Sequence, residues 1–228
     1  MKRILFVLFA CSFISANGQV ENDIMHLIKE DNTVFIDTSI LLVSDTNRRV
    51  GLREHGVWRT RSRTGELLFS VRSYYGGNAH GQSINFSNNR IINSIYYYNG
   101  IKHGPYIAFW HNGKPKYQMF YKEGKLNGIA KDFDTTGRLE KIERYKDGKK
   151  EGMEVSLYPS GNIKYLKNYI NSKENGVRKV YRDIAVLELI AEYVVENGKV
   201  ISEKVYDKEA LPIEIPLKID GNVHPEGN

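Results

Sequence analysis

Cysteine is almost absent from the sequence, because Cys11 is the single one among 228 residues. One thiol cannot form a disulfide within the chain, so a disulfide framework is excluded. Proline is also scarce, with six residues against 20 glycines and 15 tyrosines. A chain poor in proline and rich in glycine and tyrosine favours strands and turns over helices. The composition therefore predicts an all-β protein without disulfide bonds.

The motifs of common catalytic sites are missing as well. The sequence has no Gly-x-Ser-x-Gly, no His-Glu-x-x-His, no phosphate-binding loop and no cysteine–histidine pairing. Its glycine-rich turns are not followed by a predicted helix, so they cannot cradle a phosphate at a helix N-terminus. We therefore expect no catalytic residues, no metal and no cofactor, and interpret the protein as non-enzymatic.

One apolar run stands out, and it lies at the start of the sequence. Lys2 and Arg3 precede an almost unbroken apolar stretch over residues 4–14, and small residues follow up to Gly18. The stretch is too short to cross a bilayer as a helix. Its arrangement is typical of a signal peptide, here residues 1–18. We predict cleavage near Gly18 and an exported protein, either periplasmic or secreted.

Cys11 leaves a second interpretation open for this segment. Leu8-Phe9-Ala10-Cys11 resembles a lipoprotein box, in which a lipidated cysteine becomes the N-terminus and anchors the protein. Phe9 is bulky for its position and the apolar stretch before Cys11 is short. Simple cleavage is therefore the favoured interpretation.

Charge is nearly balanced in the rest of the chain. From Gln19 onward there are 31 basic and 27 acidic residues, a net charge of +4. This excess is too small to argue for nucleic-acid binding. It is consistent with weak association with an anionic membrane surface.

Glycine and tyrosine recur at a fixed spacing through more than half of the chain. A marker glycine returns every 23 to 25 residues: Gly56, Gly81, Gly104, Gly128, Gly152 and Gly176. A second glycine follows nine residues later at Gly65, Gly113, Gly137 and Gly161, with Arg90 and Ala185 as exceptions. A tyrosine lies seven residues before the markers at Tyr74, Tyr97, Tyr121, Tyr145 and Tyr169, and Tyr193 closes the series. Such a period indicates a repeat architecture.

Each repeat alternates apolar and other residues on both sides of a short turn. After Gly104 the alternation runs from Pro105 to Phe109, and it resumes from Pro115 to Tyr121. This pattern predicts a β-hairpin whose turn glycine, here Gly113, has a left-handed φ. Odd positions after the marker carry most of the apolar residues, ending at the tyrosine, so one face is expected to be better buried. The predicted fold is an elongated antiparallel β-meander of about six stacked hairpins in residues 56–199.

The ends of the chain lack this period. Residues 19–55 contain a short predicted helix after Asn22 and two β-prone runs, and we interpret them as an N-terminal cap. Residues 200–219 continue the alternation, and Pro212 and Pro216 predict a final edge strand that caps the sheet. The tail, 220–228, is predicted to be disordered.

The repeats resemble a known family. Tyr97 to Gly104 reads Tyr-x-Asn-Gly-x-x-x-Gly, and Tyr121 to Gly128 and Tyr145 to Gly152 are related. This pattern resembles the MORN repeat, especially its bacterial variant, which occurs in proteins often labelled as antitoxin components of toxin–antitoxin systems. The resemblance implies a ribbon of successive hairpins over about residues 56–199, and a link to membrane lipids, protein partners or scaffolding. An antitoxin against a cytoplasmic toxin would not carry an export signal.

Three histidines, His55, His80 and His103, stand directly before marker glycines. Equivalent positions in neighbouring hairpins are about 9–10 Å apart, because each hairpin has two strands. Metal–nitrogen bonds of about 2.0–2.1 Å cannot bridge this distance. Later repeats carry asparagine or glutamate here. We interpret the histidines as polar turn residues and predict no metal site.

The recurrent tyrosines are interpreted as structural, because the same place in each hairpin favours stacking on a neighbour. Irregularly placed aromatic residues are better candidates for a contact surface, since the repeat does not demand them. They are Tyr106, Trp110, Phe120 and Tyr158.

The sequence thus favours an exported protein-binding or scaffold module of the bacterial cell envelope, with an unidentified protein partner. An antitoxin-like or immunity-like inhibitor of a toxin, a membrane-lipid-binding MORN module and a hydrolase with dispersed residues are the alternatives.

Overall fold

The computed structural model describes residues 48–50 and 53–209. Several sequence predictions lie outside the described residues: the signal peptide with Cys11, the helix after Asn22, the strand with Pro212 and Pro216, and the C-terminal tail. Within the described residues the chain forms strands and turns and no helix, so the predicted all-β fold is confirmed. Accordingly, this part of the chain contains no helix that could span a membrane.

The strands in chain order are β1 (Arg48–Val50), β2 (Arg53–Arg61), β3 (Leu68–Tyr75), β4 (Asn78–Ser87), β5 (Arg90–Tyr98), β6 (Ile101–Phe109), β7 (Pro115–Lys122), β8 (Lys125–Leu126), β9 (Gly128–Phe133), β10 (Leu139–Lys146), β11 (Lys149–Lys150), β12 (Gly152–Leu157), β13 (Ile163–Ile170), β14 (Lys173–Glu174), β15 (Gly176–Tyr181), β16 (Leu189–Glu196) and β17 (Lys199–Val205).

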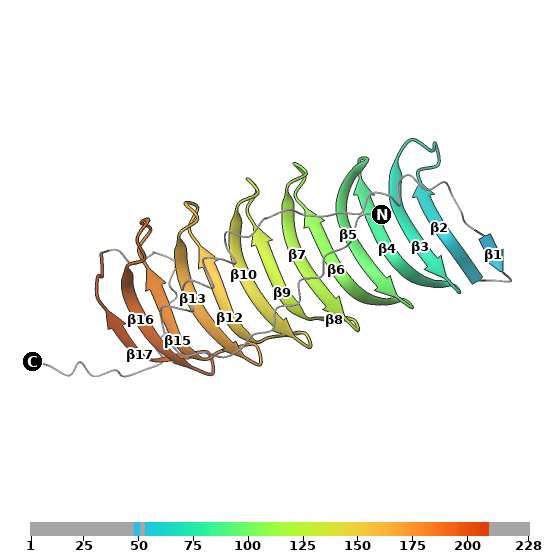
Figure 1. The fold of residues 1–228 in the computed structure, drawn as a ribbon. Helices are drawn as coiled ribbons and strands as arrows, with labels where there is room; N and C mark the ends of the chain where they lie inside the picture. The colour runs from blue at the N-terminus through green and yellow to red at the C-terminus, as the bar shows by residue number, and fades with distance from the viewer. Residues whose placement is uncertain (1–47, 51–52, 210–228) are drawn as a thin grey trace, which may run out of the picture. The chain divides into compact units, whose positions relative to one another are not determined.

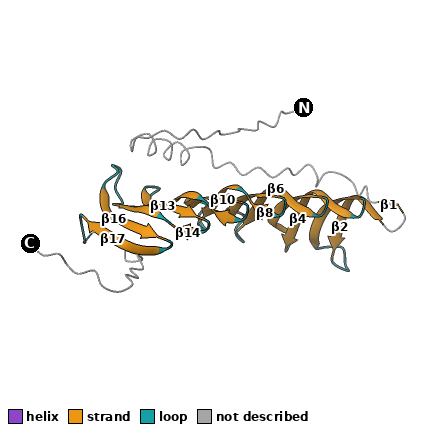
Figure 2. Ribbon diagram, turned by 90° about the horizontal axis from the view of Figure 1, so that it is seen from below, coloured by secondary structure: helices purple, strands orange, loops and turns teal. Residues whose placement is uncertain are grey.

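The strands form one open antiparallel sheet in which neighbours in space are neighbours in sequence (Figures 1 and 2). β8 and β9 both pair with β7, so they are one strand interrupted at Asn127. The same holds for β11 and β12 at Glu151 and for β14 and β15 at Asn175. The predicted meander of stacked hairpins is confirmed.

Tight two-residue turns join successive repeats along one side of the sheet, the tight-turn edge. Both turn residues have positive φ, for example 48° at Asn99 and 82° at Gly100, which defines a type I′ turn. The equivalent turns are Gly76–Gly77, Glu123–Gly124, Asp147–Gly148, Asn171–Ser172 and Asn197–Gly198. Type I′ geometry matches the twist of the strands that it joins, so each repeat passes directly into the next.

Longer turns within each hairpin form the other side, the wide-turn edge. The N–H of Gly113 donates to the carbonyl of Trp110 at 2.9 Å, and Gly137 and Gly161 make the same bond to Asp134 and Tyr158. The φ values of these three glycines are 83°, 85° and 92°, in the left-handed region expected from the sequence. Two repeats lack this glycine because their turns differ in length. Arg90 follows a tight Asn88–Asn89 turn, and Ala185 lies in a longer loop between Arg182 and Glu188.

The marker glycines lie in strand bulges rather than in the turns themselves. Tyr97 pairs with Lys102 and Ile95 with Tyr106, so two extra residues around Gly104 are accommodated on β6. Gly104 has a φ of 103°, and a Cβ added there would lie 3.2 Å from the Cβ of Tyr96. Glycine is therefore required at this position by its backbone conformation and by its close neighbour.

Each recurrent tyrosine lies directly opposite the marker glycine of its own hairpin. Tyr121 pairs with Gly104, and Tyr145 and Tyr169 pair with Gly128 and Gly152. In the last repeat Val195, not Tyr193, pairs with Gly176, because the longer loop shifts the pairing by two residues.

The predicted burial pattern was wrong in one respect. Ile107 pairs with Gln118, whereas Tyr121 pairs with Gly104, so the odd positions of the first strand and the tyrosine of the second strand point to opposite faces. The cause is a bulge in β7: Phe109 pairs with Pro115 but Ala108 pairs with Tyr117, and the extra residue between these pairs reverses the alternation between the strands. We call the two sides the tyrosine face and the opposite face.

Both faces contain buried residues. On the opposite face, directly paired positions form a row across the sheet: Val71, Ile84, Ile107, Ile142, Val155 and Leu166. On the tyrosine face, Val180, Ala191 and Tyr193 belong to a fully buried cluster near the last strands. The apolar core is therefore spread along the sheet, as expected for repeats that contact only their neighbours.

Hydrogen bonds link adjacent hairpins at both edges of the sheet. At the tight-turn edge, backbone N–H groups donate back to the preceding repeat, as from Gly124 to the carbonyl of Lys102 and from Gly148 to that of Leu126. At the wide-turn edge, the side chain of Asn89 donates back to the carbonyl of Glu66, but three other side chains donate forward. Arg90, Lys114 and Arg138 reach the carbonyls of His111, Thr136 and Pro159 respectively.

Candidate interaction surface

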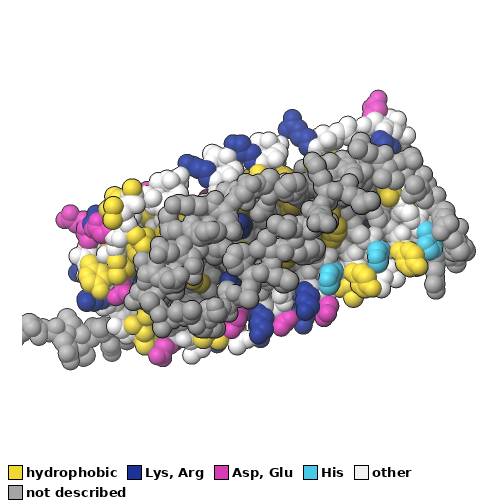
Figure 3. Space-filling view, viewed as in Figure 1, with side chains coloured by type: hydrophobic (Ala, Val, Ile, Leu, Met, Phe, Trp, Pro, Cys, Tyr) yellow, Lys and Arg dark blue, Asp and Glu magenta, His cyan; other side chains and the backbone are white. Residues whose placement is uncertain are grey.

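Five aromatic side chains form a continuous row along the tight-turn edge. The histidine–tyrosine row consists of His55, Tyr75, His80, Tyr98 and His103. Consecutive ring centroids are 5.5, 5.9, 5.1 and 6.2 Å apart, within the range of aromatic packing. Figure 3 shows histidines alternating with hydrophobic side chains along this edge. The row spans β2 to β6, the first hairpins of the sheet.

The hairpin geometry explains how this row forms. Each tyrosine is the last residue of its strand before a type I′ turn, and each histidine directly precedes a bulged glycine. Tyr75 is 67% exposed and Tyr98 is 59% exposed. The N–H of Gly76 donates to Nδ1 of His55 at 3.4 Å, which leaves Nε2 to carry the proton of the neutral ring. Nδ1 of His80 lies 3.3 Å from Oδ1 of Asn99.

The row ends at His103, although the backbone pattern continues. Lys122 and Lys146 occupy the position of the tyrosines, and Asn127 and Glu151 occupy that of the histidines. Polar contacts replace ring packing here. Nδ2 of Asn127 donates to Asp147 at 3.5 Å, and the N–H of Asn171 donates to the carboxylate of Glu151 at 2.9 Å. The fold therefore does not require aromatic rings at this edge.

Tyrosine rings separate successive histidines of the row, so the imidazoles do not converge. Among the described residues, no group of three or more histidine, cysteine, aspartate or glutamate side chains is placed to hold a metal ion.

The four aromatic residues singled out from the sequence do not share a surface. Tyr106 lies on the tyrosine face, where its ring meets that of Tyr121 edge-on at 6.2 Å. Phe120 lies on the opposite face and is 52% exposed. A partner on one face could therefore not contact both residues.

Trp110 and Tyr158 instead bridge successive hairpins. Nε1 of Trp110 donates to the carbonyl of Phe133 at 3.1 Å, and the hydroxyl of Tyr158 donates to the carbonyl of Tyr181 at 3.0 Å. Burial raises the pKa of Tyr158, which keeps its hydroxyl protonated as the donor. Both residues begin a three-residue turn, so the repeat has a structural use for a donor at this position.

A second cluster, which sequence analysis missed, lies on the tyrosine face. We call it the ion-pair chain: Asp132, Lys141, Glu143, Lys150, Glu154 and Lys167. Nζ of Lys141 lies 3.0 Å from Asp132 and 2.9 Å from Glu143. Nζ of Lys150 lies 2.5 Å from Glu143 and 3.0 Å from Glu154. Both glutamates are only 5% exposed.

The electrostatics of this chain indicate fixed charges. Burial raises the pKa of Glu143, but hydrogen bonds from Lys150 and Lys141 outweigh it and lower the pKa to about 2. Burial together with a hydrogen bond to Glu143 raises the pKa of Tyr145 to about 12. The carboxylate is therefore ionised and the phenol protonated at neutral pH. These protonation states favour a structural role of the two side chains over proton transfer.

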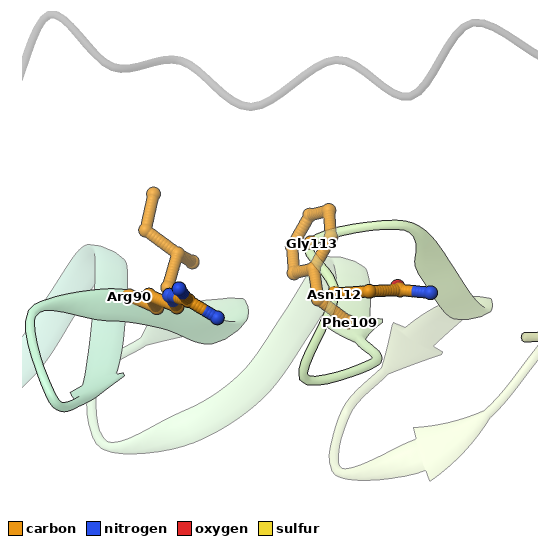
Figure 4. Close-up of a pocket in the computed structure, with 5 residues that line it drawn as sticks. Arg90, Phe109, Asn112 and Gly113 are labelled. Carbon is orange, nitrogen blue, oxygen red and sulfur yellow. The ribbon is translucent and has the colours of Figure 1, made fainter.

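Two shallow depressions flank the turns at the start of β5 and the end of β6. One has a volume of about 430 Å³ and is lined by Arg90, Ile91, Phe109, Asn112 and Gly113 (Figure 4). The other measures about 470 Å³ and adds Ser87, Asn88, Ile92, Trp110 and His111 to Arg90 and Ile91. Arg90 already donates to the carbonyl of His111 at 3.1 Å. The lining residues include no carboxylate and no nucleophile paired with a base, so they favour no reaction.

Comparison with known proteins supports the repeat assignment. The family model described as MORN repeat variant matches residues 102–123 and 150–171. Each match runs from the strand beside a marker glycine, through one hairpin, into the following tight turn. No curated protein sequence matches the chain.

Similarity to solved structures is weak. A point mutant of Staphylococcus aureus TarM, in complex with fondaparinux, alpha-GlcNAc-glycerol and UDP, is 16% identical with a TM-score of 0.31, over 61% of this chain and 24% of that chain. Streptococcus pneumoniae accessory secretory protein 1, 2 and 3 is 11% identical with a TM-score of 0.24, over 69% and 24%. Because this chain spans only 24% of those chains, and the scores are low, they support no conclusion about function. Two hairpins of this chain therefore match the MORN repeat variant, and the other hairpins share their arrangement of strands and turns.

Proposed function

We propose that this protein is an exported, non-enzymatic repeat protein that binds a protein partner in the bacterial cell envelope, with the histidine–tyrosine row as its contact surface. The observation that carries this proposal is the exposure of Tyr75 and Tyr98 in a row that the fold does not require. Repeat proteins present extended binding surfaces, and aromatic residues are enriched in protein interfaces.

The charge distribution supports a binding role over catalysis. In the ion-pair chain, each ionised group of Lys141, Glu143 and Lys150 already has an oppositely charged partner within 3.0 Å. The exposed rings of the row offer apolar area with polar tips, which suits recognition by contact.

Site-specific photo-crosslinking tests the binding surface. A photo-reactive phenylalanine analogue is placed at position 98 or, as a control, at position 146, which has the same place in a later hairpin. In the native cells, we expect a protein adduct from position 98 and none from position 146. Equal labelling at both positions, or no adduct at either, would contradict the proposal.

Export is supported by the basic and apolar pattern of residues 1–18. Mass spectrometry of the natural protein should find an N-terminus at or near Gln19. An intact Met1 in the mature protein would contradict export, and a lipidated Cys11 would make the protein a lipoprotein. The toxin-inhibitor and lipid-binding functions rest on the family resemblance alone.

A further inference from the structure

We propose that the histidine–tyrosine row binds a proline-rich segment in the polyproline II conformation. This inference rests on the proposed function, since it names the kind of protein segment that the same surface would bind. Three features of the row support it: its spacing, its position on the fold and its hydrogen-bonding groups.

The spacing of the tyrosines matches the period of polyproline II. Tyr75 and Tyr98 hold equivalent positions two strands apart, which places them about 9.6 Å from each other. The ring centroids of Tyr75 and Tyr98 lie 5.9 and 5.1 Å from that of His80 between them, so the two tyrosine rings can be no farther apart than the sum of these distances. A polyproline II helix rises about 3.1 Å per residue with three residues per turn, a period of about 9.3 Å. Every third residue of such a helix would therefore meet an equivalent ring.

The histidines recur along the row at the same spacing as the tyrosines. His55, His80 and His103 also recur once per hairpin, so the five rings cover two repeats of the sheet, about 20 Å. This length accommodates about six residues of polyproline II. Aromatic surfaces are the usual docking sites for such segments, because the preformed helix loses little entropy on binding.

The position of the row disfavours the other common modes of peptide recognition. Strand addition needs an unpaired strand, but β3, β4, β5 and β6 are paired on both sides. A bound amphipathic helix needs an apolar groove, whereas Tyr75 and Tyr98 project as exposed side chains. Recognition of phosphorylated or acidic segments needs clustered arginines, and the row itself contains no basic side chain other than histidine.

The polar tips of the row suit the same ligand. Polyproline II has no internal hydrogen bonds, so its carbonyls need donors from water or from a partner. Tyrosine hydroxyls are donors, and Nε2 of neutral His55 carries a proton because Nδ1 accepts from Gly76. The row therefore combines ring faces for proline with donors for the carbonyls.

Calorimetric titration of the full chain with a ten-residue oligoproline tests this inference. A ten-residue glycine–serine peptide and chitohexaose serve as comparison ligands. We expect saturable binding of oligoproline, weakened at least tenfold by Tyr98→Lys or Tyr75→Lys. Lysine is the residue found at the equivalent position 122, so these variants should fold. The matched control is Ile170→Lys, because Ile170 holds the equivalent position in a later hairpin and is 47% exposed. This variant should leave oligoproline binding unchanged.

The outcomes separate this inference from the proposed function. Absence of oligoproline binding, or equal loss in Ile170→Lys, would overturn it. Tyrosine-dependent binding of chitohexaose instead would assign the row to glycans and overturn it as well. If crosslinking from position 98 still yields a protein adduct in either case, protein binding stands and only the polyproline II assignment fails.

Discussion

The early and middle hairpins share a backbone but differ in the side chains that occupy it. At the tight-turn edge, rings pack on rings up to His103, and polar contacts replace them from Lys122 onward. On the tyrosine face, the position two residues before the recurrent tyrosine holds buried Ile95 in one repeat and buried Glu143 in another. The contrast separates what the repeat requires from what it permits. Glycines at positive φ recur because the backbone needs them, whereas side-chain rows can change along the sheet.

Loss of the charge on Glu143 should have the largest effect. Glu143→Gln leaves Lys141 and Lys150 without their shared carboxylate in a site where the glutamate is 5% exposed. Each lysine keeps a second carboxylate, Asp132 or Glu154, so the expected loss lies at the lower end of the cost of breaking a buried ion pair, about 3 kcal/mol. Urea unfolding should show this loss, and Glu140→Gln, an exposed neighbour on β10, should be nearly neutral. Equal midpoints for the two variants would refute a stabilising role of the ion-pair chain.

The same carboxylate should make stability depend on acid pH. Its pKa is about 2 in the folded protein, against an ordinary value of 4.5. A lowered folded-state pKa means that the stabilisation is complete above about pH 4.5 and is lost as the pH falls towards 2. The urea midpoint should therefore fall more between pH 6 and pH 3 in the natural protein than in Glu143→Gln. Other carboxylates titrate in both proteins, so parallel pH profiles would contradict this assignment.

Substitution of a turn glycine should have a smaller effect. Gly137→Val places a β-branched residue at a φ of 85°, and its Cβ would lie 3.2 Å from Cδ of Lys114. The expected loss is about 2 kcal/mol. Gly161→Val isolates the backbone contribution, because nothing lies within 4 Å of the added Cβ.

Thr135→Val is the matched control for these variants, since Thr135 is exposed in the same turn as Gly137. Thr136 is less suitable, because its hydroxyl donates to Asp134 at 2.6 Å. If Thr135→Val lowers the urea midpoint as much as Gly137→Val does, left-handed backbone strain is not the cause.

Extension of the aromatic row should change stability least. Lys122→Tyr with Asn127→His would continue the ring packing into the next hairpin. Exposed substitutions usually alter stability by less than about 0.5 kcal/mol, so the urea midpoint should hardly move. Titration with a longer oligoproline should show a several-fold gain in affinity over the natural chain. A folded variant without any gain would mean that the row does not bind along its length.

Local chemistry allowed much of the fold to be predicted from the sequence. Gly113, Gly137 and Gly161 mark their turns because a left-handed φ favours glycine. The face on which each side chain lies was predicted less well, since one extra residue in a bulge of the second strand reverses its alternation relative to the first strand.

Contacts between repeats could not be predicted from the sequence, because they also depend on the register of the strands. The bond from Trp110 to the carbonyl of Phe133 joins residues 23 apart in the chain. Tyr75 and Tyr98 follow the recurrent Tyr74 and Tyr97, so only the register of the sheet places them between histidines. The members of the ion-pair chain are visible in the sequence as charges on strands, but their pairing also depends on register.

Backbone donors at the tight-turn edge and side-chain donors at the wide-turn edge make the sheet modular. From Arg90 to Arg138, each wide turn sends a donor forward, and each tight turn from Gly100 to Gly148 sends one back. A duplicated hairpin would bring both a donor for one neighbour and an acceptor for the other, so every new junction would be satisfied. Gain or loss of a whole unit preserves this matching, whereas gain or loss of a single strand breaks it. The edge bonds therefore favour changes in the length of the array by whole hairpins.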